Sequence, residues 1–274
     1  MRTDLLRSYT LSQKGEEARE EVSNMTDLSY RERRGQIETY FDRTAVQAWA
    51  RLTSDAPVGR VRASVRAGRD RMRATLLAWL PDDLRGQRLL DAGCGTGALA
   101  IEAAHRGASV LAIDLSPTLV ALARERQPPI RNAGTIDFRS GDMLAPELGE
   151  FDYVVGMDSV IHYESGDAVN VLAGLAQRTR IGMLFTFVPS NPALEVFRAV
   201  GKLFPRGDRS PAVVPVPERW LHRRIDSEPQ LQGWARGRTQ RISSGFYTSQ
   251  ALELGRVSPP GPSNDRATAG GVQR

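Results

Sequence analysis

The sequence predicts an α/β fold in which helices cover both faces of a mostly parallel, seven-stranded sheet. Three observations predict it. Short apolar runs alternate with segments of helical period through the middle of the chain, a glycine-rich turn follows the first run, and a hairpin pattern ends the folded part. The chain of 274 residues is 41% hydrophobic and 25% charged, which is enough to bury the core of one large domain.

Each apolar run is short enough for a strand. We place five parallel strands at residues 88–92, 109–113, 135–139, 151–157 and 181–187, with helices at 97–106, 117–127 and 167–178. Ser116 and Pro117 suit the cap and the first turn of the second helix. An antiparallel hairpin over 234–241 and 245–252 completes the sheet at one edge.

Residues 58–80 have a helical period with two stripes. The apolar stripe contains Val61, Val65, Met72, Leu76 and Leu80. The second stripe contains Arg62, Arg66, Arg69 and Arg73, which we interpret as a solvated face.

Composition divides the chain into six segments. These are a polar leader at 1–30, an N-terminal helical cap at 31–87, the core at 88–189, an insertion at 190–233, the hairpin at 234–254 and a tail at 255–274. The leader contains a second candidate start at Met25. Leader and tail offer few residues to bury, so we expect both to be disordered.

Charge and cysteine content narrow the class of protein. The net charge of +5 combines +6 over 31–88 and +5 over 190–241 with −5 over 89–189, so an acidic core lies between basic flanks. The chain has one cysteine, Cys94, and therefore no internal disulfide. It has no apolar run of the roughly 18 residues that a spanning helix needs, and no signal-peptide pattern, so we expect a cytoplasmic protein.

The strongest motif is LLDAGCGTGALA at 89–100. Gly93, Gly95 and Gly97 follow Asp91 at the end of a strand, a spacing that lets the backbone approach a ligand closely. Asp114 ends the next strand, where a carboxylate can accept both hydroxyls of a ribose. The dinucleotide fingerprint is G-x-G-x-x-G, so this spacing disfavours the alternative of a nicotinamide-dependent oxidoreductase.

The motif resembles motif I of the class I S-adenosylmethionine-dependent methyltransferases, a Rossmann-like family. The resemblance implies S-adenosyl-L-methionine as cofactor and an acidic residue after the third strand, here Asp142 in SGDM, as the acceptor for the adenine amino group. Asp158 follows the fourth strand, where the pocket opens to substrate. The cofactor residues expected are Asp91, Gly93, Cys94, Gly95, Gly97, Asp114, Leu115, Asp142, Met143 and Asp158. Cys94 is expected to be a small filler in the loop rather than a reactive thiol.

Segments outside the glycine-rich motif make the resemblance more specific. Five segments are together similar to the magnesium-protoporphyrin IX methyltransferases of the bacteriochlorophyll pathway. They are YFDRTAVQAWARL at 40–52, VRAGRDRMRATLLAWLP at 65–81, DSVIHY at 158–163, GKLFPRGDRSP at 201–211 and GFYTSQALEL at 245–254. That family methylates one propionate of its substrate to the monomethyl ester. The magnesium belongs to the substrate, and the sequence shows no spacing typical of a protein metal site.

The resemblance also points to partners and to substrate residues. It makes magnesium chelatase a candidate partner and the photosynthetic membrane a candidate surface for peripheral contact. His162 could orient the carboxylate, ligate the magnesium or be structural, and Tyr163 lies beside it. Tyr40 and Phe41 are expected to begin a helix that covers the cofactor as a lid, with Tyr40 contacting substrate. Arg206 and Arg209 are expected to hold the second propionate.

Two other methyltransferase functions remain as alternatives. One is transfer to another small carboxylic acid. The other is nucleic-acid methylation, which the sequence pI of about 9.8 permits. Methylation of a base amino group usually needs an Asn/Asp/Ser-Pro-Pro-aromatic segment after the fourth strand, and here that position reads MDSVIHY. The sequence also lacks interleaved aromatic and basic residues, so we do not expect a nucleic-acid partner.

Overall fold

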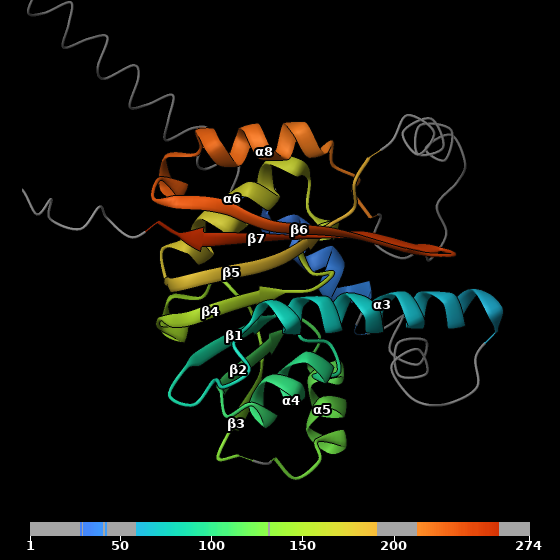
Figure 1. Cartoon of the computed structure of the whole chain (residues 1–274). Coiled ribbons are helices and arrows are strands. Elements are labelled where there is room, and N and C mark those ends of the chain that lie inside the picture. Colours follow the sequence, from blue (N-terminus) through green and yellow to red (C-terminus); the bar gives the residue numbers. More distant parts are fainter. Residues whose placement is uncertain are drawn as a thin grey trace, which may run out of the picture.

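A seven-stranded mixed sheet organises the molecule, with strand order β3-β2-β1-β4-β5-β7-β6 (Figure 1). The computed structural model describes residues 28, 30–40, 42, 59–130, 132–190 and 213–257. The strands are β1 (Arg88–Ala92), β2 (Ser109–Asp114), β3 (Thr135–Ser140), β4 (Phe151–Gly156), β5 (Thr179–Phe187), β6 (Trp234–Ser244) and β7 (Tyr247–Arg256). The first five are parallel, and β7 is antiparallel to both β5 and β6. The predicted fold is confirmed.

The central strands are apolar because both of their faces are covered. Leu90 in β1 pairs with Leu111 in β2 on one side and with Val154 in β4 on the other. All three side chains are at most 4% exposed. Since β2 and β4 flank β1 while the chain leaves β1 toward β2, the strand order reverses beside β1, and a crevice opens there at the carboxyl ends of the strands.

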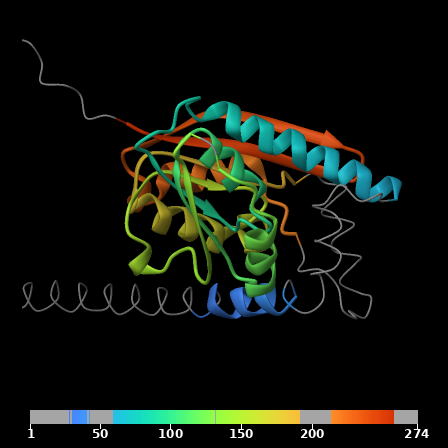
Figure 2. The same ribbon diagram turned by 90° about the horizontal axis from the view of Figure 1, so that it is seen from below.

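Helices cover the two faces of the sheet with separate apolar clusters. The helices α3 (Arg60–Trp79), α4 (Ala98–His105) and α5 (Pro117–Arg126) pack on one face. The helices α6 (Ser165–Ala176) and α8 (Glu218–Ser227) cover the other. The described residues 30–40 are helical and join this second cluster through Tyr30 and Ile37. Figure 2 shows α3 running along the C-terminal hairpin, with the helix of residues 30–40 on the opposite side of the molecule.

Short-range chemistry sets the ends of several elements. Ser116 caps α5 by accepting the Leu119 N–H at 3.2 Å, and Pro117 occupies its first turn, as predicted. Single 3-10 turns form at η2 (Pro146–Leu148), η3 (Val160–His162) and η4 (Pro229–Leu231). None of the helices in the described ranges is both long and apolar enough to cross a bilayer.

The hairpin is longer than the sequence predicts. Strand β7 continues to Arg256, whose Nη1 donates to the Thr179 carbonyl at 3.0 Å and whose guanidinium lies 5.5 Å from the Trp234 ring. Gly255 pairs with Gly182 of β5. The boundary at residue 254 is therefore wrong, because backbone pairing continues through residues that have no apolar side chain to signal it.

Two other expectations need correction, and one helix was not predicted. Tyr30 is helical and buried, so the folded part begins before residue 31. Val61 is half exposed and does not join the core, whereas Met72, Leu76 and Leu80 do. Helix α8, which the sequence analysis does not assign, is rich in charge and buries only Leu221 and Ile225.

Candidate active site

A cavity of about 310 Å³ lies in the crevice at the carboxyl ends of β1, β2 and β4. It contains most of the residues expected from the sequence, although they come from four separate stretches of chain. Those that line it are Asp91, Gly93, Cys94, Gly95, Asp114, Leu115, Met143, Asp158, His162 and Tyr163. The structure thus brings together eight of the ten expected cofactor residues and the two expected catalytic residues, His162 and Tyr163.

The glycine loop between β1 and α4 is shaped by three positive φ angles. At Gly93 (φ +83°) an added Cβ would lie 2.4 Å from the Ser159 Cβ, so the loop approaches the segment after β4 closely. At Gly95 (φ +54°) an added Cβ would enter open space on the cavity side. This open cradle fits a ligand that lies directly against the backbone.

Gly97 has a different role from the one expected. It does not line the cavity, and at φ +78° an added Cβ would lie 2.6 Å from the Phe138 ring. Gly97 therefore lets α4 begin close to β3.

Two carboxylates, the buried Asp91 and the half-buried Asp114, hold the loop from behind. The Oδ2 atom of Asp114 accepts the Gly95 N–H at 2.8 Å, and its Oδ1 atom accepts the Ser116 N–H at 3.0 Å. Burial raises the pKa of Asp114 above its ordinary value. Asp91 accepts the Ala100 N–H at 3.1 Å, and burial, aided by the neighbouring Asp114, raises the pKa of Asp91 to about 7. Both groups would ionise more readily beside a cationic ligand.

The Cys94 thiol is not set up for nucleophilic chemistry. Burial raises the pKa of this thiol well above its ordinary value, and the neighbouring carboxylates of Asp114 and Asp91 add to the shift. At neutral pH the group is a thiol rather than a thiolate. This agrees with its expected part as a small filler in the loop.

Asp142 is the second expected cofactor residue outside the cavity lining. Its carboxylate accepts a hydrogen bond from the Tyr30 hydroxyl at 2.7 Å and pairs with Arg34 Nη1 at 2.7 Å. The Leu144 N–H also donates to it at 2.8 Å. The helix of residues 30–40 is therefore fixed to the loop after β3, which the sequence did not suggest.

His162 and Tyr163 form a buried corner of the cavity. His162 lies in η3, and its carbonyl accepts the Arg33 Nε–H at 2.6 Å. The Tyr163 ring stacks on Tyr30 with centroids 5.3 Å apart. Burial raises the pKa of Tyr163 to about 12, so its hydroxyl stays protonated and can act as a hydrogen-bond donor.

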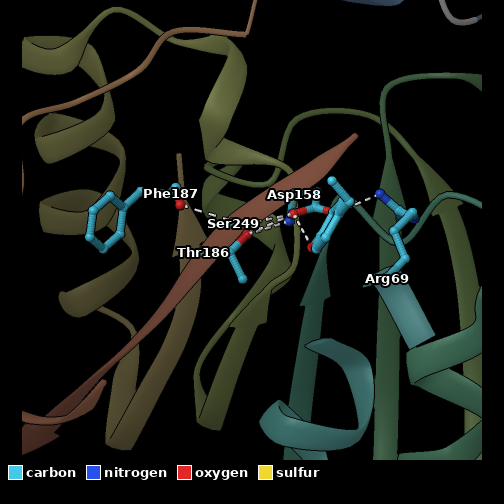
Figure 3. A network of polar contacts seen from close by, with 6 residues as sticks. Arg69, Asp158, Thr186, Phe187 and Ser249 are labelled. Carbon is cyan, nitrogen blue, oxygen red and sulfur yellow. Dashed lines mark hydrogen bonds and ion pairs between the residues drawn. The ribbon is translucent and has the colours of Figure 1, made fainter. Parts of the chain in front are cut away.

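Asp158 lies at the centre of a polar network at the end of β4 (Figure 3). Its backbone has φ +53°, an uncommon conformation for a residue with a side chain. The carboxylate accepts hydrogen bonds from Tyr247 at 3.1 Å, Ser249 at 3.2 Å and Thr186 at 3.1 Å. It also pairs with Arg69 Nη1 at 2.6 Å. Asp158 thus joins α3, β5 and β7 at the edge of the cavity.

The solvated-face interpretation of the arginines on α3 is wrong for three of the four. Arg66, Arg69 and Arg73 line the cavity, whereas Arg62 is exposed. Their spacing was visible in the sequence. Spacing alone cannot distinguish a cationic stripe that faces solvent from one that faces a cavity, because both satisfy the same helical period.

Of the remaining substrate candidates, only Tyr40 falls within the described residues. Tyr40 is half-buried and lies late in the helical stretch of residues 30–40 instead of beginning it, and it is not among the lining residues. Ile37, one turn earlier, lines the cavity in its place. Phe41, Arg206 and Arg209 fall outside the described residues.

Comparisons with known proteins agree with this geometry. Residues 89–182 match the model of a methyltransferase domain, and residues 156–256 match the model of the magnesium-protoporphyrin IX methyltransferase C-terminus. The second match covers the whole hairpin and Asp158 with its partners on β5 and β7, whereas Arg69 lies outside it.

Curated relatives match almost their whole length. A magnesium-protoporphyrin O-methyltransferase of Rhodobacter capsulatus is 47% identical over 225 residues, which is 82% of this chain and 97% of the relative. The corresponding protein of a Synechocystis strain is 30% identical over 79% of this chain and 94% of its own. A crystal structure of the Synechocystis magnesium protoporphyrin IX methyltransferase with bound S-adenosylhomocysteine superposes with a TM-score of 0.70 at 28% identity, covering 81% of this chain and 99% of that one. This chain belongs to the magnesium-protoporphyrin IX methyltransferase family, within the class I methyltransferases.

Proposed function

We propose that this protein transfers a methyl group from S-adenosyl-L-methionine to one propionate of magnesium protoporphyrin IX, in bacteriochlorophyll synthesis. The products are the monomethyl ester and S-adenosylhomocysteine. The observation that carries the proposal is the 47% identity with the Rhodobacter enzyme over nearly its full length. The cavity adds chemical support, because it combines an open glycine cradle with buried acids and a wall of arginines.

The residues around the cradle fit the cofactor. Gly95 leaves space at the backbone, and Asp114 would accept ribose hydroxyls while it holds the loop. Asp91 would attract the positively charged end of the ligand, because the hydrogen bonds described for its buried carboxyl include no cationic donor. When bound, S-adenosylmethionine supplies a methyl group already activated by its sulfonium.

The protein's own task is then alignment and exclusion of water. A propionate is ionised near pH 7, so no strong general base is required. We assign His162 to orienting the attacking carboxylate, because it lines the cavity and Arg33 fixes its backbone. Tyr163, kept protonated and held by stacking on Tyr30, would donate a hydrogen bond in the same corner.

Asp142 would receive the adenine amino group only alongside its present partners. Its two carboxylate oxygens accept from Tyr30, Arg34 and the Leu144 N–H. A carboxylate has about four acceptor positions, so one more donor can be accommodated. Adenine recognition would then be shared between the loop after β3 and the helix of residues 30–40.

The cellular setting is also part of the proposal. Magnesium chelatase makes the substrate that this reaction consumes and is therefore the candidate partner. We expect a cytoplasmic protein that contacts the photosynthetic membrane peripherally, since its substrate is a large apolar disc. Neither expectation requires a membrane-spanning helix.

The test is direct. The full chain is incubated with methyl-labelled S-adenosylmethionine and magnesium protoporphyrin IX, and chromatography should show a labelled monomethyl ester. Asp114→Ala is the control, with an expected loss in cofactor binding on the order of 1.5–3 kcal/mol per charge-assisted bond removed. His162→Ala should lower turnover far more than it lowers the affinity for S-adenosylhomocysteine. If the wild-type protein binds S-adenosylhomocysteine but forms no ester, the substrate assignment is wrong.

A further inference from the structure

Most of the charged side chains that line the cavity come from two walls, and the remaining two, Asp70 and Asp158, are paired with arginines of the second wall. The carboxylates of Asp91 and Asp114 come from β1 and β2, behind the glycine loop. The arginines all come from α3, at positions 66, 69 and 73, which share one helix face. We call these three residues the α3 arginine face. Such a cavity suits ligands whose positive charge lies near the carboxylates of Asp91 and Asp114 and whose negative charge lies near the arginines.

Arg69 is held in place before any ligand arrives. Its Nη1 lies 2.6 Å from Asp158 Oδ2, and Asp158 is itself fixed by Tyr247, Ser249 and Thr186 (Figure 3). The side chain of Asp158 is only 5% exposed, so this pair lies in a region of low dielectric. Asp158 is therefore a positioning residue, and the anchored guanidinium is part of a preorganised wall.

Arg73 is held less tightly. Its Nη2 pairs with Asp70 Oδ1 at 2.9 Å, one helical turn away, but the Asp70 side chain is 51% exposed. A surface ion pair of this kind contributes little, typically below about 1 kcal/mol. A carboxylate entering the cavity could exchange with Asp70 at small cost, and the planar guanidinium matches a carboxylate through two parallel hydrogen bonds.

We propose that the α3 arginine face is a carboxylate-binding site of the cavity, with Arg73 as its exchangeable contact and Arg69 as its fixed one. The proposal rests on the proposed function, which brings two carboxylates here in addition to the propionate that is methylated. One is the amino-acid carboxylate of the cofactor, and the other is the propionate that remains unmethylated. Both would be recognised by the same guanidinium chemistry.

The experiment compares Arg73→Gln with Arg62→Gln in the full-length chain. Arg62 belongs to the same helical stripe but is exposed and does not line the cavity, so it is the matched control. Arg73→Lys keeps the positive charge but removes the planar guanidinium that can make two parallel hydrogen bonds. The readouts are calorimetric Kd values for S-adenosylhomocysteine and for 5′-methylthioadenosine, which lacks the amino-acid part. Absorbance titrations supply Kd values for magnesium protoporphyrin IX and for its dimethyl ester.

Two results support the site and separate its ligands. If the cofactor carboxylate binds there, Arg73→Gln raises the Kd for S-adenosylhomocysteine at least about tenfold, equivalent to about 1.4 kcal/mol. The Kd for methylthioadenosine then stays unchanged. If the propionate binds there, the same variant raises the Kd for magnesium protoporphyrin IX by that factor and leaves the Kd for the dimethyl ester unchanged. In either case Arg73→Lys should recover part of the affinity, and Arg62→Gln should match the wild type.

The proposal is overturned if Arg73→Gln leaves all four Kd values within twofold of the wild type. It is also overturned if the ligands with and without carboxylates weaken equally, because a general disturbance of the cavity would do that. Failure of the proposed function is a separate result. In that case the wild-type protein would not bind or methylate magnesium protoporphyrin IX, while the pair of adenosine ligands would still test the arginine face.

Discussion

Asp91 carries an unusual charge state for a carboxylic acid. With a pKa of about 7 in the folded protein, it is substantially protonated near neutral pH, and a cationic ligand beside it would favour ionisation. The affinity for S-adenosylhomocysteine, which has an ammonium group, should therefore fall as the pH drops through 7. Between pH 7.5 and pH 6 we expect about an eightfold loss by calorimetry. Asp91→Asn should bind more weakly and show little of this slope, and an unchanged slope would contradict the assignment.

The same carboxyl group should influence stability in the ligand-free protein. Because its folded-state pKa lies above its ordinary value of 3.8, Asp91 favours folding in its protonated form. That contribution is complete below about pH 4 and is lost as the pH rises through 7. Asp91→Asn retains an oxygen that can accept the Ala100 N–H. We expect it to raise Tm, relative to wild type, more at pH 8 than at pH 5, as measured by calorimetry.

Substitutions at two glycines of the loop should have different effects on cofactor binding and on stability. Gly95→Ala places a methyl group in open cavity space at the cost of about 1–2 kcal/mol for a left-handed backbone, so it should mainly weaken cofactor binding. Gly97→Ala has the same backbone cost and also forces a methyl group against Phe138. It should lower Tm markedly more than Gly95→Ala. Equal Tm values for the two variants would show that Phe138 moves aside freely.

At the scale of elements, the end of β7 determines where the chain can be shortened. Deleting residues 255–274 removes the pairing of Gly255 with β5 and both contacts of Arg256. Deleting residues 258–274 removes only the polar tail. We expect the first truncation to lower Tm by several degrees and the second to leave Tm near that of the full chain. A similar loss for both would show that the tail itself contributes to stability.

Elements were predictable where burial leaves a repeated pattern. Strands β1, β2 and β4 are buried on both faces, so their apolar runs are distinct, and Ser116-Pro117 marks the start of α5. Helix α8 buries only two residues among charged ones, and therefore gives a weak signal. The ends of the hairpin depend on backbone pairing, which side-chain patterns do not record.

The site was predictable only in part, for a similar reason. Asp91, Gly93 and Gly95 lie within the local motif at 89–100, whose spacing itself specifies the loop, and Asp114 ends the next strand along the chain. The hydrogen bond from Tyr30 to Asp142 spans 112 residues, and the pair between Arg69 and Asp158 spans 89. Such partners meet only through tertiary packing, so no local pattern identifies them.

For the molecule as a whole, the cavity is assembled from both sides of the sheet. The helix of residues 30–40 reaches it from the cluster that contains α6, and α3 reaches it from the cluster that contains α4. The glycine loop lies between them at the strand ends. Ligands bound in this cavity would therefore contact elements of both apolar clusters at the same time.

The network around Asp158 has a kinetic consequence for the hairpin. Any local opening of β7 would withdraw Tyr247 and Ser249 from a buried carboxylate and leave its charge poorly compensated. A carboxylate bound on the α3 arginine face should make such openings rarer. Amide hydrogen exchange in residues 247–250 should then slow when S-adenosylhomocysteine and magnesium protoporphyrin IX are both bound, measured by mass spectrometry. Residues 169–175 of α6, none of which lines the cavity, serve as the internal reference, and protection that rises equally in both segments would indicate global stabilisation instead.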